Sequence, residues 1–227
     1  MILKTTNPVY SEKIKSSHYA GIFLIALSTL LLEFTLTRVL SVALWYHFAF
    51  MIISVALLGF GISGVVYSLS KKLNAIETDK LLTILSLLYG TSVMVCFLLM
   101  NKIPFDPFSL LTDPVQFVYL PLYYLLITIP FFFAGLIITI LLSVFKNSVS
   151  KLYFFDLTGA GLACLAFVLI IPAAGGNGGI IFVAAFGFLA AMVFGFEKYK
   201  NLVIVSAVLC GVSFTYMIDR DNRFPVN

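Results

Sequence analysis

Long apolar runs alternate with short polar stretches along almost the whole chain. We expect seven of these runs to be membrane-spanning helices: Ala20–Val42, His47–Leu69, Leu81–Met100, Phe117–Val144, Leu152–Pro172, Ile180–Phe196 and Leu202–Met217. About 20 residues cross a hydrocarbon core, so the fourth run is expected to be tilted or broken near Pro130. Lipid does not tolerate unpaired backbone groups, so the runs are predicted to be helices. The alternation of a membrane barrel is absent.

The lysines predict the orientation of this helix bundle. If seven helices cross, one side of the membrane receives Lys4, Lys13, Lys15, Lys71, Lys72, Lys80, Lys146, Lys151, Lys198 and Lys200. The other side receives Lys102, Arg220 and Arg223. Basic loops stay in the cytoplasm, which predicts an internal N-terminus and an external C-terminus. We therefore expect a cytoplasmic tail over 1–18, an all-α transmembrane domain over 19–217 and a short external tail over 218–227.

Composition agrees with a membrane protein and narrows its partners. Of the 227 residues, 61% are hydrophobic and 11% are charged, far below the charged share of soluble domains. The net charge of +4 comes from short lysine clusters, which suit lipid headgroups better than nucleic acid. Cys96, Cys164 and Cys210 lie inside apolar runs and are predicted to be small buried hydrophobic residues. No motif predicts a metal or a cofactor.

Glu33 is the first candidate for chemistry, because it lies past the middle of the first apolar run. A carboxylate facing lipid there would cost at least about 2.5–3.5 kcal/mol. We therefore expect Glu33 to face the bundle and to reach Arg38, His47 or a threonine. Thr29 and Thr37, four residues away on either side, extend the same face. A substrate, cation or proton site and a structural buried pair are equally compatible with this pattern.

Three further residues accompany Glu33 as a candidate ligand or buried polar site. Arg38 is either its partner or an interfacial arginine that extends outward. His47, after Trp45 and Tyr46, is either part of the site or an aromatic-belt residue. Asp156 near the start of the fifth run either caps that helix or lines an inner vestibule.

The loop between the third and fourth runs predicts a structured outer lid. Asp106 and Asp113 come just before Tyr119 and Tyr123, which gives an acidic and aromatic surface suited to a cationic or amphipathic molecule. A solvated loop beside an aromatic belt explains the same residues. Thermal stabilisation by amines would distinguish these interpretations.

Small residues predict where helices approach closely. Gly59 and Ser63 lie four apart in the second run, and Gly159 and Ala163 do so in the fifth. The glycine-rich stretch 175–179 is predicted to be a flexible connector between the fifth and sixth helices.

Several stretches also resemble a known family: residues 32–41 with Glu33 and Arg38, 46–50, 56–64, and 152–162 with Asp156 and Gly159. They are similar to the membrane portion of bacterial spermidine-synthase-like proteins, whose helices precede an aminopropyltransferase-like domain. The resemblance covers the first, second and fifth helices. It implies a bacterial inner-membrane location. The sequence contains no Gly-rich strand–helix turn, so we do not expect this chain to be catalytic alone.

Two classes of function follow from these observations. The first is a membrane module that binds a small molecule or lipid, or anchors a soluble aminopropyltransferase-like or methyltransferase-like enzyme. The second is a small transporter. A purely structural subunit of a membrane complex is a third interpretation.

Overall fold

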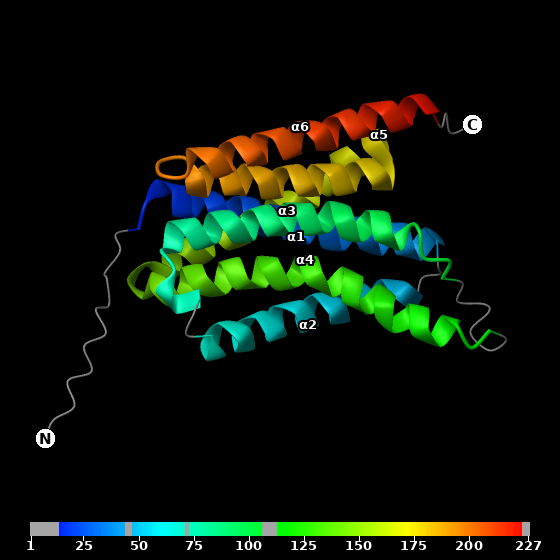
Figure 1. Cartoon of the computed structure of the whole chain (residues 1–227), viewed down its shortest axis with the longest axis horizontal. Coiled ribbons are helices and arrows are strands. Elements are labelled where there is room, and N and C mark those ends of the chain that lie inside the picture. Colours follow the sequence, from blue (N-terminus) through cyan, green and yellow to red (C-terminus); the bar gives the residue numbers. More distant parts are fainter. Residues whose placement is uncertain (1–13, 44–46, 71–72, 106–112, 224–227) are drawn as a thin grey trace, which may run out of the picture.

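The fold is built from helices that pack side by side in a bundle. The computed structural model describes residues 14–43, 47–70, 73–105 and 113–223, and within these ranges it contains no strand. The helices are α1 Ser16–Ala43, α2 His47–Leu69, η1 Leu73–Ala75, α3 Thr78–Met100, α4 Gln116–Val144, η3 Lys146–Ser148, α5 Val149–Gly195 and α6 Lys200–Arg223 (Figure 1). The predicted all-α class is therefore correct for the described chain.

The lengths and compositions of the helices are those of a multi-pass membrane protein. Five helices, α1 to α5, are long and apolar enough to cross a membrane, and α6 contributes the shorter apolar stretch Lys200–Ser213. The α4 helix contains Pro121 and Pro130 but continues through both. The predicted break near Pro130 is therefore wrong, and α4 is one helix.

The α5 helix reverses its direction at a single residue. Gly175 has φ 65° and ψ −175°, a backbone conformation that is essentially restricted to glycine. Residues 176–179, which the sequence predicted as a flexible connector, are helical instead. We call residues 149–174 the first arm of α5 and residues 176–195 its second arm.

The first arm runs parallel to α1. Tyr19 near the start of α1 packs on Phe155, with 5.2 Å between ring centroids, and Phe34 packs on Phe167 at 5.5 Å. Residue numbers therefore rise together along the two helices. A methyl group on Gly159 would lie 2.3 Å from the Phe23 carbonyl oxygen, so the backbones touch directly at that point.

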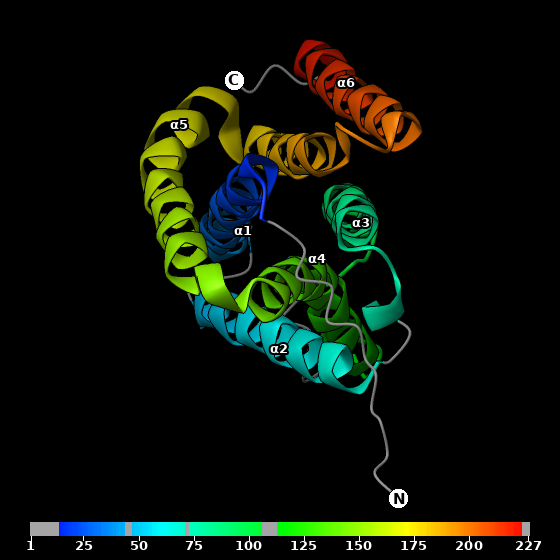
Figure 2. The ribbon, with the colours of Figure 1, turned by 90° about the vertical axis from the view of Figure 1, so that its left-hand side faces the viewer.

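The second arm runs antiparallel to α1. Gly21 near the start of α1 lies against Phe194, whereas Thr35 further along lies against Gly179. The chain thus passes along α1, turns at Gly175 and returns along it. In Figure 2 the curve of α5 surrounds one side of α1.

The remaining helices pack around α1 and the second arm of α5. Tyr89 of α3 contacts Gly187 of the second arm, and its hydroxyl lies 2.8 Å from Ser28 Oγ of α1. On the other side of the bundle α2 packs on α4, with Gly59 against Phe131. Figure 2 shows α2 and α4 on the side of α1 opposite to α6.

One buried hydrogen-bonded chain joins three of these helices. Ser28 Oγ donates its proton to the Val183 carbonyl oxygen at 2.7 Å. Because a serine hydroxyl carries a single proton, the Tyr89 hydroxyl must be the donor to Ser28. Both side chains are 0% exposed. Each such hydrogen bond inside a membrane protein contributes roughly 0.6 kcal/mol. The two hydrogen bonds therefore fix the register of α1, α3 and α5 more than they stabilise the bundle.

The close approach at Gly159 predicts a large difference between two glycines on one helix. Gly159→Ala should lower the free energy of unfolding by about 1–3 kcal/mol, because the new methyl group forces α1 and the first arm apart. Gly161→Ala, where a methyl group meets nothing within 4 Å, is the matched control and should be neutral or slightly stabilising. Reversible unfolding in detergent micelles measures both. Equal effects of the two substitutions would contradict the packing described here.

Candidate functional site at the basic end

Several helix ends meet at one end of the bundle. The His18 ring of α1 lies 4.6 Å from the ring of Phe145, the residue after α4, and Lys15 reaches both Asp79 at the start of α3 and Glu197 after α5. The exposed lysines at these helix ends are Lys80, Lys146, Lys151, Lys198 and Lys200. We call this the basic end.

A buried histidine–aspartate pair lies at the centre of the basic end. His18 is 1% exposed and Asp79 is 8% exposed. The backbone N–H of Lys15 donates to His18 Nδ1 at 3.1 Å, which places the proton of a neutral ring on Nε2. Nε2 then donates to Asp79 Oδ1 at 2.8 Å. The two hydrogen bonds fix both the ring orientation and its tautomer.

Lys15 extends this pair to the turn between α5 and α6. Its ammonium group donates to Asp79 Oδ2 at 3.0 Å and to Glu197 Oε2 at 2.6 Å. The hydrogen bond to Glu197, followed by that to Asp79, raises the pKa of Lys15 above its ordinary range. Lys15 is therefore fully charged at neutral pH, and it ties α1 to α3 and α5.

A second ionic group lies beside the first. Lys198 and the Tyr199 hydroxyl both donate to the carboxylate of Glu77, the residue before α3. The hydrogen bonds from Lys198 and then Tyr199 hold the pKa of Glu77 below its usual value, and the same contact raises the pKa of Lys198. Lys198 also lies 3.9 Å from Asp79, so the two groups form one network.

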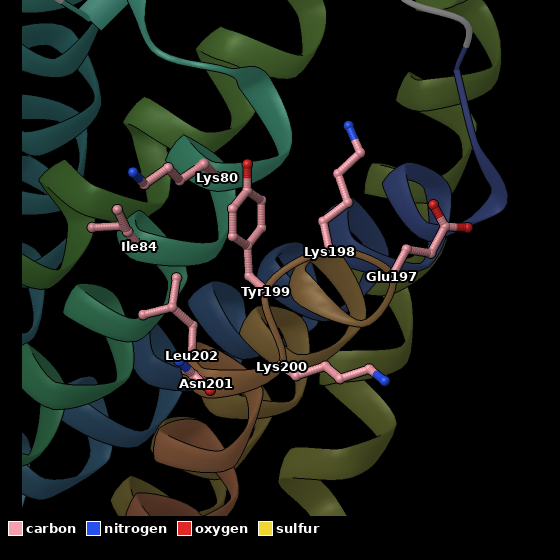
Figure 3. A pocket seen from close by; sticks show the side chains of 8 residues that line it. All are labelled: Lys80, Ile84, Glu197, Lys198, Tyr199, Lys200, Asn201 and Leu202. Atoms are coloured by element: carbon pink, nitrogen blue, oxygen red, sulfur yellow. The ribbon is translucent and has the colours of Figure 1, made fainter.

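An open cavity of about 500 Å³ adjoins this network. It lies between the start of α3 and the start of α6 (Figure 3). Its polar lining includes Lys80, Lys198, Tyr199 and Lys200, while Ile84 and Leu202 give it apolar walls. The cavity therefore combines positive charge with hydrophobic surface at the end of the bundle.

The structure does not assemble the site predicted around Glu33. Glu33 is half-buried, and its carboxylate makes no hydrogen bond or ion pair with any side chain that the structure describes. Arg38 is exposed and does not pair with Glu33. Neither Thr29 nor Thr37 bonds to Glu33, and the Thr29 hydroxyl donates to the Ile25 carbonyl oxygen at 2.7 Å. The His47 side chain lies outside the described part. Among the described residues Glu33 therefore has no partner at Arg38 or a threonine, and the third expected partner, His47, stays a prediction.

Asp156 is also separate from Glu33. The α5 helix begins at Val149, so Asp156 lies two turns inside it and cannot cap its N-terminus as one prediction had it. Asp156 follows Phe155, which packs on Tyr19 near the start of α1. Glu33 precedes Phe34, which packs on Phe167 further along both helices. The two carboxylates are therefore separated by about ten to thirteen residues along the helices, or roughly 15–20 Å in height.

Of the four residues predicted for the outer lid, Asp113 and Tyr123 have structural partners. Asp113 accepts hydrogen bonds from the Val115 backbone N–H at 3.1 Å and from the Gln116 side chain at 3.2 Å, which fastens the start of α4. Tyr123 donates to the Met100 carbonyl oxygen at 3.2 Å. Tyr119 is half-buried, and Asp106 lies outside the described residues. Ligand binding by this lid stays a prediction.

The residues predicted for helix packing lie at helix contacts. Gly159 and Ala163 are buried on α5, and Gly159 meets α1. Gly59 touches α4, and Ser63 is 0% exposed where it faces Gly135. Among the cysteines, Cys96 is buried, but Cys164 is exposed on α5, contrary to expectation.

The ionic network is not predicted from the sequence. The lysines of the sequence predict an orientation, and no motif singles out His18 or Asp79. The available signal was acidic residues beside the lysines of the interhelical stretches: Glu77, Asp79 and Glu197. The pairing itself joins residues 61 and 182 positions apart, which no local pattern reveals.

No group of three or more His, Cys, Asp or Glu residues in the described ranges could hold a metal ion. Comparison of the chain with protein-family models, with curated proteins and with solved structures found no match.

The buried pair predicts a strong effect of Asp79. Asp79→Ala should lower the free energy of unfolding by about 1–3 kcal/mol, because the Nε2 proton of His18 loses its acceptor in a buried place. Lys80→Ala is the control, because Lys80 is the next residue, is exposed and makes no ion pair among the described residues. This substitution should change the free energy of unfolding by less than about 0.5 kcal/mol. Micelle unfolding measures both. A neutral Asp79→Ala would contradict the role given to the pair.

Proposed function

We propose that this chain is a seven-pass integral membrane module that anchors a soluble enzyme at its basic end, with that end in the cytoplasm. The seven passes follow if α5 counts as two, one for each arm, and α6 as one. All described lysines except Lys102 lie at one end of the bundle, which supports an internal N-terminus. The resemblance to spermidine-synthase-like proteins suggests an aminopropyltransferase-like or methyltransferase-like partner.

This topology predicts the outcome of cysteine labelling. Single cysteines at Lys146 and Lys200, in a background without native cysteines, should react only from the cytoplasmic side. A cysteine at Asn177, beside the turn of α5, should react only from outside. If α5 crossed the membrane once, Lys146 and Lys200 would be labelled from opposite sides, and the seven-pass proposal would fail.

The observation that carries the anchoring proposal is the ionic network at the basic end. It ties α1, α3 and the turn between α5 and α6 into one surface through Lys15, Asp79, Glu197, Glu77 and Lys198. A surface that is already ordered loses little conformational entropy when a partner binds. Phe196, 73% exposed on the same turn, offers an apolar contact beside these charges.

Site-specific crosslinking tests the proposal. A photoreactive benzoylphenylalanine at Phe196 should capture, in native membranes, an enzyme of the proposed class that mass spectrometry identifies. The same residue at Phe117, 61% exposed at the opposite end of the bundle, is the matched control and should capture none. Capture of that enzyme at both positions, or at neither, would contradict anchoring at the basic end.

A second candidate function is transport, and two carboxylates favour it. Glu33 and Asp156 are half-buried within apolar helices and have no hydrogen-bond or ion-pair partner among the described side chains. Such groups often mark ion or proton pathways. Flux of a polyamine into proteoliposomes that Glu33→Gln abolishes would replace the anchoring proposal with this one.

A further inference from the structure

The cavity between α3 and α6 has a charge that its own surroundings do not neutralise. Its lining carries Lys80, Lys198 and Lys200 against the single acid Glu197. Glu197 is bound by Lys15, and Lys198 is bound to Glu77. Lys80 and Lys200 make no ion pair with any described residue. The cavity therefore presents two positive charges that are free to bind an anion.

The two lysines approach the cavity from different helices. In Figure 3 Lys80 extends from α3 and Lys200 from α6, and their ammonium groups point outward on opposite sides of Tyr199 and Leu202. Both are exposed, and their flexible four-carbon stems allow the ammonium groups to move over the cavity. An anion seated there contacts charges from both helices once the two stems turn inward over the cavity.

The apolar walls distinguish this cavity from a simple phosphate site. From Ile84 the same face of α3 continues through Leu88 and Val95, which are 43% and 46% exposed. From Leu202 the corresponding face of α6 continues through Val205, 47% exposed. These faces lead from the cavity along the bundle, where acyl chains would lie.

We propose that this cavity binds the headgroup of an anionic phospholipid, with Lys80 and Lys200 on its phosphate and Ile84 and Leu202 against its upper acyl carbons. Basic pockets between transmembrane helices on the cytoplasmic side bind anionic headgroups. The proposal rests on the proposed placement of the basic end at the inner membrane surface. It requires neither the partner enzyme nor transport.

Native mass spectrometry of the detergent-solubilised protein tests the proposal with phosphatidylglycerol as the probe. The unmodified protein should retain phosphatidylglycerol in preference to phosphatidylcholine. Lys80→Gln/Lys200→Gln should weaken retention of phosphatidylglycerol by roughly thirtyfold, given the contribution of each lysine near a lipid surface. Lys80→Arg/Lys200→Arg keeps both charges and should retain the lipid, and an unchanged unfolding transition of the glutamine variant excludes misfolding as the cause of a loss.

The matched control removes the same charge from the same end outside the cavity. Lys146→Gln/Lys151→Gln should leave retention within about twofold of the unmodified protein. An equal loss in this variant would overturn the proposal in favour of diffuse attraction, as would equal retention of the two lipids. Glycerol phosphate is the headgroup without its chains. If it competed with phosphatidylglycerol as strongly as the lipid itself, the site would be one for a free phosphate.

The lipid proposal and the anchoring proposal can fail separately. Retention is measured on the purified chain, so its loss in the cavity variant says nothing about a partner at Phe196. Crosslinking at Phe196, in turn, does not depend on Lys80.

Discussion

The close contact of α1 with both arms of α5 is the constraint on which the rest of the bundle depends. It requires a helix that reverses within one residue and a surface without side chains where the backbones meet. Gly175 provides the reversal through its positive φ, and Gly159 allows the Phe23 carbonyl oxygen to approach. Inside lipid there is no hydrophobic gain from helix association, so such backbone contact supplies the van der Waals energy that holds helices together.

Polar groups inside the bundle divide into two kinds. Hydroxyls such as Ser28 and Tyr89 bond across helices, which satisfies them where water is absent. The Thr35 and Ser86 hydroxyls are buried without a hydrogen-bond partner among the described residues, and Thr35 lies against Gly179. Charged groups are treated differently: the paired ones lie at the basic end, while Glu33 and Asp156 stay half-buried within the helices.

The ion pairs at the basic end contribute more to position than to stability. Exposed pairs such as Lys198 with Glu77 are worth little in water, because solvent screens them and the long side chains lose entropy. The buried His18–Asp79 pair, by contrast, leaves an unsatisfied group when it is broken. Together they hold the helix ends that border the cavity, so one network orders both the surface proposed for a partner and the pocket proposed for a lipid.

The sequence by itself determined that the protein is helical and that its helices are suited to a lipid bilayer. Apolar runs of about 20 residues require helices in lipid, and the boundaries of α2 and the end of α3 follow from where those runs stop. The spacing of Gly159 and Ala163 indicated a close helix contact, because residues four apart share a helix face.

Only the tertiary structure decided the details that matter for function. It confined a predicted five-residue connector to Gly175, because neighbouring α1 supports helix up to that residue and directly after it. It left Glu33 without the partner expected at Arg38, because neighbours along one helix do not determine which side chains meet. It paired Lys15 with Glu197 and His18 with Asp79, contacts between residues distant in sequence. Such pairs depend on how the helices pack against one another, which the residue pattern of a single helix does not determine.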